Sequence, residues 1–107
     1  MVGIYIGGAY YHIPIVMDGV ISAVAALCAH RLCKSVSDYI IPSHMSSEIA
    51  MKYICDELKL EPVIYGGFHL GEGTGAVAVL PLIDMALHVY YEAARFDDIG
   101  VKQYTKQ

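Results

Sequence analysis

Short apolar runs alternate with helix-length segments along this chain, and this alternation constrains the fold more than any other feature. The strand-length runs are Ile13–Met17, Tyr39–Ile41 and Val63–Tyr65, and the helix-length segments after them are Val20–Leu32, Ser46–Leu58 and a segment from Thr74 to about Phe96. Such alternation is typical of βαβ units. The sequence therefore predicts an α/β fold, with a parallel sheet covered by helices on both faces in a three-layer, Rossmann-like arrangement.

Local signals predict where these elements begin and end. Ser46 or Ser47 is the expected N-cap of the second helix, with Glu48 in its first turn. Pro81 lies inside the last helical segment and is expected to kink it. Gly7-Gly8 precedes the first strand and is interpreted as either a turn or the tail of a helix.

The chain of 107 residues has no internal linker, so residues 1–107 are predicted to form a single unit that ends in a polar tail, 97–107. Hydrophobic residues make up 56% and charged residues 17% of the sequence. A typical soluble domain has about 45–50% apolar and about 25% charged residues. We therefore expect the excess apolar surface to meet a second subunit or a missing part of the same protein.

Composition and run length exclude several classes of function. The net charge of −4 and the lack of a Lys/Arg cluster argue against binding to nucleic acid. The uncharged runs Gly19–Ala29 and Thr74–Ile83 are shorter than the roughly 20 residues of a spanning helix, and both are expected to be buried. The start of the chain lacks a signal-peptide pattern, so a cytoplasmic location is expected. The spacing of the cysteines indicates no metal site, and no cofactor is predicted.

Three polar loops are expected to meet at one edge of the sheet. Ligands of parallel α/β sheets bind outside the carboxyl ends of the strands. In this chain those ends carry Asp18-Gly19, the segment from Ser43 to Ser46, and the loop around Glu72.

The loop Gly71-Glu72-Gly73-Thr74-Gly75 is the strongest local signal. Glycines allow positive φ and close approach to a ligand, and free N–H groups at the start of a helix attract anions. The loop matches neither a Walker motif nor a complete dinucleotide fingerprint. Glu72 at its centre is interpreted as a general base or, alternatively, as a solvated glutamate that complements the helix dipole.

Other polar residues near this edge have two interpretations each. Asp18 is expected either to bind a ligand hydroxyl or to cap the helix that begins at Val20. His44, with Ser46, matches no metal-ligand spacing and is interpreted as a capping and substrate-contact segment. In contrast to His12, His30 and His88, which lie in or beside apolar segments, His69 is expected at the site, because it lies two residues before the glycine loop.

The order of several segments resembles the carboxyl-terminal part of the nicotinate-nucleotide–dimethylbenzimidazole phosphoribosyltransferase family. The matching segments are Gly7-Gly8-Ala9, His12 to Ile21, Ser43 to Ser46, Leu70 to Ala76 and Pro81-Leu82, so the resemblance covers nearly the whole chain. The most specific piece is Leu70 to Ala76, at the right distance after Pro14-Ile15-Val16-Met17-Asp18-Gly19.

The resemblance implies an enzyme that transfers phosphoribosyl from nicotinate mononucleotide to 5,6-dimethylbenzimidazole, giving α-ribazole phosphate and nicotinate for the lower ligand of cobalamin. It also implies a homodimer that needs no cofactor. Glu72 matches the glutamate that is the general base of the family. The remaining expected substrate contacts are Leu70, Gly71, Gly73, Asp18, His44, Ser46 and His69, with Tyr65 or Phe68 against the flat base.

Two departures from the family pattern keep a second interpretation open. Many relatives carry arginine where this chain has His69, and family members are several times longer. The missing region supplies much of the base pocket. The alternative is therefore a noncatalytic interaction or oligomerisation module, and a general nucleotide-binding module is a third, weaker interpretation.

Overall fold

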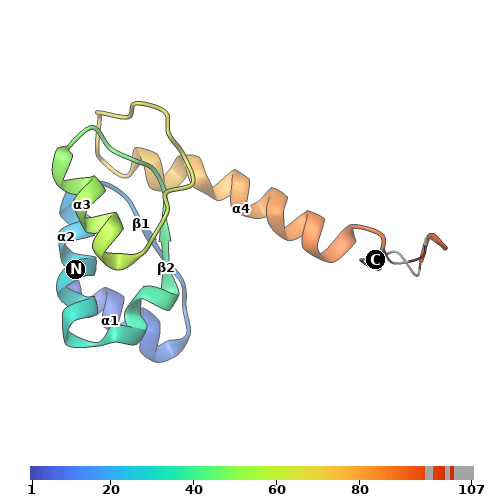
Figure 1. Ribbon diagram of the computed structural model, residues 1–107, viewed down its shortest axis with the longest axis horizontal. Coiled ribbons are helices and arrows are strands. Elements are labelled where there is room, and N and C mark those ends of the chain that lie inside the picture. The colour runs from blue at the N-terminus through green and yellow to red at the C-terminus, as the bar shows by residue number, and fades with distance from the viewer. Residues whose placement is uncertain (96–97, 101, 103–107) are drawn as a thin grey trace, which may run out of the picture.

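The structure is a computed structural model that describes residues 1–95, 98–100 and 102. The elements are α1 (Val2–Tyr11), β1 (Ile15–Met17), α2 (Val20–Leu32), the 3₁₀ helix η1 (Lys34–Tyr39), β2 (Ile40–Pro42), α3 (Ile49–Leu58) and α4 (Thr74–Glu92) (Figure 1). Most of the predicted polar tail, 97–107, lies outside the described residues.

Strands β1 and β2 form a small parallel sheet, as the alternation predicts. Ile15 pairs with Ile40, and Met17 pairs with Pro42. The third predicted strand is reduced to a parallel bridge between His44 and Ile64. The fold class is therefore mixed α/β, with a narrower sheet than expected in the part of the chain that the structure describes.

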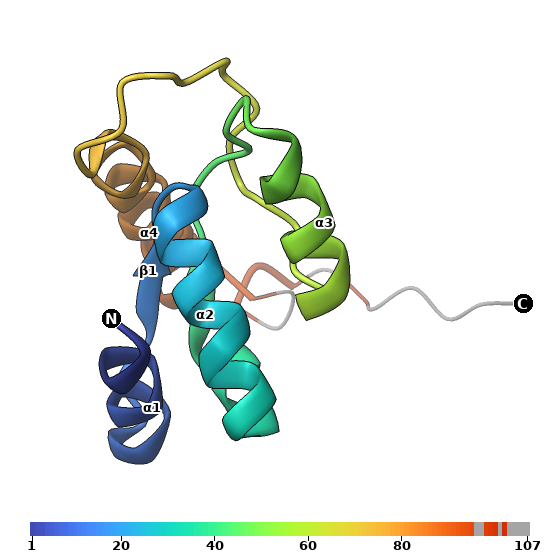
Figure 2. The same ribbon diagram turned by 90° about the vertical axis from the view of Figure 1, so that its left-hand side faces the viewer.

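The core lies between this sheet and a layer formed by α1, α2, η1 and α3. Helix α2 lies between α1 and α3 (Figure 2). Its bounds match the prediction, and its buried side chains are alanines, including Ala23, Ala26 and Ala29. Small side chains let neighbouring helices approach closely. Met17 of β1 and Met51 of α3 fill the space between the layers and are fully buried.

The amino-terminal segment resolves one of the open alternatives. Gly7 and Gly8 lie inside α1 and do not form a turn. A Cβ atom on Gly8 would lie 2.9 Å from the carbonyl oxygen of Ile13 and 2.5 Å from Ile15 Cγ1. Glycine at position 8 therefore lets α1 pack directly on the chain that enters β1.

The predicted N-cap of the second helix is wrong. Helix α3 begins at Ile49, and Glu48 is its N-cap in place of Ser46 or Ser47. The backbone just before it is held extended, because the N–H of Met45 donates a hydrogen bond to the carbonyl of Ile64 at 2.9 Å. Glu48 is itself extended, with φ −71° and ψ 128°, so the first helical residue is Ile49.

Helix α4 differs most from expectation. It extends away from the body of the molecule (Figure 1), and only Gly75 and Val79 of its residues are buried. The prediction that Thr74–Ile83 is a buried helix is therefore wrong, because no other described element covers most of its length. Its large exposed apolar residues are Val77, Leu80, Leu82, Met85, Leu87, Val89, Tyr90 and Tyr91.

The length of α4 also bears on the membrane prediction. The helix continues through Pro81 to Glu92, four residues short of the predicted end at Phe96. With 19 residues and a mean hydropathy of 1.3, it is long and apolar enough to cross a membrane by length and composition alone. The length argument against a spanning helix therefore fails for α4. The core helix of a soluble protein meets the same criterion, so this finding is weak evidence for a membrane span.

Candidate functional site

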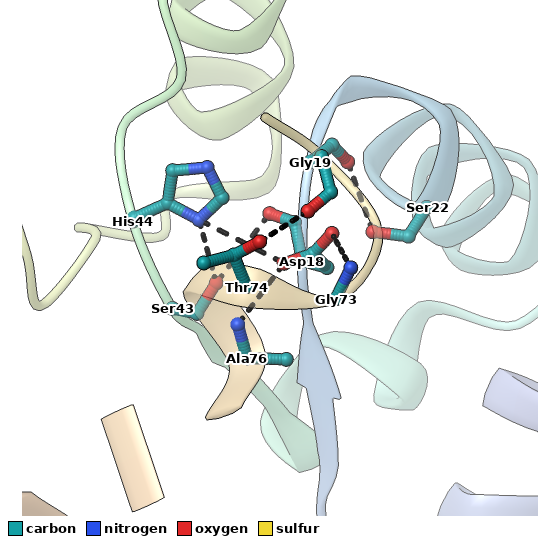
Figure 3. Close-up of polar contacts among 9 residues, drawn as sticks. Asp18, Gly19, Ser22, Ser43, His44, Gly73, Thr74 and Ala76 are labelled. Atoms are coloured by element: carbon teal, nitrogen blue, oxygen red, sulfur yellow. Dashed lines mark hydrogen bonds and ion pairs between the residues drawn. The ribbon is translucent and has the colours of Figure 1, made fainter. Parts of the chain in front are cut away.

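The three predicted polar loops meet where β1 and β2 end and α4 begins (Figure 3). Asp18 and Gly19 follow β1, and Ser43 and His44 follow β2. The backbone N–H of Ser43 donates to the carbonyl of Met17 at 3.0 Å, which holds the two strand ends side by side. The prediction that these loops converge at one edge is confirmed.

The carboxylate of Asp18 binds the amino-terminal end of α4. Its Oδ2 accepts a hydrogen bond from the N–H of Gly73 at 3.2 Å, and its Oδ1 accepts one from the N–H of Ala76 at 3.0 Å. The alternative that Asp18 caps α2 is therefore wrong. Gly19 is the N-cap of that helix, and the carboxylate of Asp18 makes no hydrogen bond to its first turn. Asp18 instead caps a helix that begins more than 50 residues later.

His44 packs against the same helix end. Its ring is 4% exposed, its Nδ1 lies 3.0 Å from Ser43 Oγ and 4.0 Å from Asp18 Oδ1, and its ring centroid is 5.2 Å from that of Phe68. A Cβ atom on Gly75 would lie 1.8 Å from His44 Nδ1. The missing side chain at position 75 therefore makes room for the imidazole.

The loop before α4 has three consecutive residues in the left-handed region. The φ angles are 74° at Gly71, 56° at Glu72 and 78° at Gly73. Thr74 closes the loop, because its N–H donates to the carbonyl of Gly71 at 3.1 Å and its hydroxyl donates to the same oxygen. For Glu72 this backbone conformation costs about 1–2 kcal/mol relative to the right-handed region.

The two glycines and Glu72 therefore have different physical roles in the loop. Gly71 and Gly73 adopt positive φ without steric cost. Glu72 bears the cost, and its side chain is exposed at the edge of the sheet where α4 begins. A strained residue with an exposed carboxylate at such an edge is typical of a functional position.

The N–H groups at the start of α4 are largely used within the protein. Those of Gly73 and Ala76 donate to Asp18, and that of Thr74 donates to the carbonyl of Gly71 at 3.1 Å. The Asp18 carboxylate thus supplies the negative charge that the helix dipole favours. The Gly73 N–H already has an acceptor and does not offer a free donor to a phosphate.

The other predicted contact residues lie on the neighbouring loops. Leu70 and His69 are exposed, and His69 Nδ1 lies 3.1 Å from the hydroxyl oxygen of Ser47, which joins the chain before the glycine loop to the chain before α3. Ser46, the residue before Ser47, is buried. The sequence placed Ser43 in the polar loop after the second strand but gave no signal for the contact of its hydroxyl with His44.

The chain has a mixed α/β fold with an acidic glycine-rich loop at the carboxyl ends of its parallel strands. Comparison with known proteins identifies the family to which such a chain belongs. Residues 1–101 match the model of a family described as "Phosphoribosyltransferase". The chain therefore belongs to the nicotinate-nucleotide–dimethylbenzimidazole phosphoribosyltransferase family, as the names of its relatives indicate.

Two bacterial relatives of that name illustrate the match. The protein from Clostridium acetobutylicum is 44% identical over 104 residues, covering 97% of this chain and 30% of the relative. The protein from Acetivibrio thermocellus is 40% identical over 107 residues, covering all of this chain and 30% of the relative. The chain spans about 30% of the length of these relatives.

A solved structure supports the same relation. The crystal structure of CobT from Thermus thermophilus superposes with a TM-score of 0.87 and is 32% identical, covering 96% of this chain and 31% of that protein. Helix α4 and the loop before it therefore belong to an arrangement that a crystal structure also contains.

Proposed function

We propose that this chain is the part of a nicotinate-nucleotide–dimethylbenzimidazole phosphoribosyltransferase that carries the general base, Glu72. The single observation behind this proposal is the exposed Glu72 carboxylate, held by a left-handed glycine loop at the carboxyl ends of two parallel strands. The names of the relatives supply the substrates, nicotinate mononucleotide and dimethylbenzimidazole.

In the proposed reaction, one ring nitrogen of the benzimidazole attacks C1′ of the ribose. The bond between C1′ and the nicotinate nitrogen breaks, and its electron pair stays on nicotinate. Glu72 accepts the proton from the other benzimidazole nitrogen, so the product is neutral at that ring. Positive charge develops on the sugar during this substitution, and a nearby carboxylate stabilises it.

The neighbouring residues have supporting roles in this proposal. Leu70 and Phe68 offer apolar surface to the flat base, and Gly71 offers its backbone to the sugar or phosphate. His69 replaces the arginine common in relatives, and in this proposal its imidazole makes the substrate contact at that position.

The remaining substrate surface belongs to another polypeptide segment or subunit in this proposal. The exposed apolar side chains of α4, such as Leu80, Met85 and Tyr90, support such a partner, because isolated soluble proteins rarely expose contiguous apolar patches of that kind. The partner is either the longer remainder seen in relatives or a second copy of the chain. In the complete protein we infer a wider sheet with helices on both faces in three layers, and a cytoplasmic location.

The test measures nicotinate release from nicotinate mononucleotide in the presence of dimethylbenzimidazole. It uses this chain alone and a chimera in which the chain replaces the matching segment of the Clostridium acetobutylicum relative. The chimera is expected to be active, and Glu72→Gln is expected to lower kcat by about 10²–10⁴-fold, the usual contribution of a general base. Glu61→Gln, which changes an exposed glutamate outside the loop, is the matched control.

The outcomes separate the enzyme from the alternative module. An active chimera whose kcat does not change in Glu72→Gln would refute the base assignment. A folded chimera without activity would refute the enzyme proposal for this chain and favour the noncatalytic interaction module.

A further inference from the structure

We infer that Asp18 is a positioning residue, which fixes the loop that carries Glu72 and does not itself bind substrate. This inference rests on the proposed function and deepens it. It differs from the expectation that Asp18 contacts a ligand hydroxyl.

The hydrogen bonds of Asp18 straddle the start of α4. Oδ2 binds the N–H of Gly73, the residue directly after Glu72, and Oδ1 binds the N–H of Ala76 in the first turn of the helix (Figure 3). One carboxylate thus holds both the last loop residue and the first helical turn. The position of Glu72 relative to β1 is therefore set by Asp18.

Both oxygens of Asp18 already accept a hydrogen bond from the start of α4, so the carboxylate has a role within the protein. Its side chain is 22% exposed, and His44 Nδ1 lies 4.0 Å from Oδ1. The carboxylate therefore acts as an internal cap. A substrate group bound to the remaining lone pairs would share the carboxylate with the start of the helix, and removal of Asp18 would then raise the KM.

The surroundings of Asp18 give it little freedom to move. Asp18 follows β1 directly, and its carbonyl accepts a weak hydrogen bond of 3.5 Å from the Ser43 hydroxyl. The same hydroxyl contacts the buried His44 ring, which packs against Gly75 of α4. The two strand ends and the helix end thus form one connected polar cluster around the carboxylate.

Asparagine at position 18 would disturb this geometry with little change in volume. Its amide has one acceptor oxygen, so its NH₂ group would face one of the two backbone N–H donors. The loop would lose one of its two anchors and the negative charge at the helix start. A shift of about 1 Å at a catalytic group can cost about 100-fold in rate.

The test introduces Asp18→Asn into the active chimera described above, both alone and together with Glu72→Gln. We expect Asp18→Asn to lower kcat at least about tenfold, with little change in the KM for nicotinate mononucleotide. In the Glu72→Gln background the same change is expected to have no further effect on the residual rate, because residues that act as a unit are not additive. Asp38→Asn, an exposed aspartate on η1, is the matched control and is expected to leave both rates unchanged.

Amide hydrogen exchange gives a readout that does not depend on activity. In the 107-residue chain and in the chimera, Asp18→Asn is expected to accelerate exchange at Gly73 and Ala76 and to leave the amides of α2 unchanged. If the chimera with native Asp18 is inactive, the proposed function fails, and exchange alone decides the positioning role.

Several results would overturn the inference. A raised KM with an unchanged kcat would indicate a direct substrate contact, and an equal loss of rate in both backgrounds would indicate a role independent of Glu72. Unchanged exchange at Gly73 and Ala76 would exclude the anchor itself. If circular dichroism shows that Asp18→Asn does not fold, Asp18→Glu replaces it. The longer side chain keeps the charge but displaces the loop. A native rate and native amide exchange in Asp18→Glu would also refute the inference.

Discussion

Gly75→Ala is the substitution that most directly tests the packing around His44. The new Cβ atom would lie 1.8 Å from Nδ1, 2.3 Å from Cε1 and 2.7 Å from Cγ of the imidazole, whereas ordinary contacts begin at 3.4 Å. The ring would have to move by about 1.6 Å, the difference between 3.4 and 1.8 Å. His44 is 4% exposed and lies between Ser43 and Phe68, so no open direction receives it.

The expected cost follows from two opposing effects. Overpacking of a core typically costs about 1–3 kcal/mol, and loss of the His44–Ser43 hydrogen bond adds about 1 kcal/mol. Alanine is favoured over glycine in a helix by at most about 1 kcal/mol. The net decrease in the free energy of unfolding is therefore about 1–3 kcal/mol, or roughly 4–24 °C in Tm at about 4–8 °C per kcal/mol.

The assay is urea and thermal unfolding of the 107-residue chain, followed by circular dichroism. Gly7→Ala is the matched control, because Gly7 lies inside α1 and a Cβ atom there meets nothing within 4 Å. This control is expected to increase the free energy of unfolding by about 0.5–1 kcal/mol. A Gly75→Ala variant as stable as the native chain would refute the inferred contact between α4 and His44.

Three other substitutions or reactions test separate features of the chain. Glu72→Gly is expected to raise the free energy of unfolding by about 1 kcal/mol, because glycine adopts the φ of 56° without the left-handed cost; a lower urea midpoint would contradict that conformation. Pro81→Ala is expected to stabilise the chain by up to about 3 kcal/mol, since it restores a helical N–H donor inside α4; an unchanged Tm would show that the helix does not continue through this position. Burial raises the pKa of the Cys55 thiol, so Cys28 and Cys33 are expected to react with a thiol reagent at about pH 8 well before Cys55 does, and equal rates would exclude burial of Cys55. Because the folded chain holds the Cys55 proton more tightly than the unfolded chain, the free energy of unfolding is expected to fall as pH rises above the ordinary thiol pKa, which pH-dependent urea titrations would measure.

The sequence correctly predicted those elements whose bounds depend on local signals within the element and directly beside it. Helix α2 has the predicted bounds Val20–Leu32. The short strand ends just before Gly19, and Gly19 is the N-cap, so the helix begins at Val20. Parallel pairing of the first two apolar runs is also confirmed. The run Val63–Tyr65 contributes only a bridge at Ile64, which pairs with the backbone that follows β2 through hydrogen bonds to Ser43 and Met45.

The exposure of α4 could not be predicted from its composition. An apolar helix is buried only when another element covers it, and in the described part of this chain only Gly75 and Val79 of α4 are covered. The apolar composition of α4 alone therefore does not determine whether the helix is covered, and its partner surface stays a proposal. The chain spans about 30% of the length of its relatives.

The candidate site also combines a residue with a local sequence signal and a residue whose contacts are distant in the sequence. The sequence singles out Glu72 as a candidate because a carboxylate is unusual at the centre of a glycine loop, and the structure adds a left-handed φ at this residue. Its role as a base stays a prediction. The role of Asp18 was not identifiable, because capping rules concern neighbouring residues and its partners Gly73 and Ala76 are more than 50 positions away.

The conformation of Glu72 and the hydrogen bonds of Asp18 are physically linked. A glutamate in the left-handed region is disfavoured by about 1–2 kcal/mol, so a free loop would relax to another conformation. Asp18 opposes that relaxation with two hydrogen bonds to the backbone after Glu72, and charged acceptors make such bonds stronger than neutral ones. Thr74 closes the loop on itself, whereas Asp18 ties the loop to the end of β1. Removal of the Asp18 anchor is therefore expected to affect the proposed reaction through Glu72.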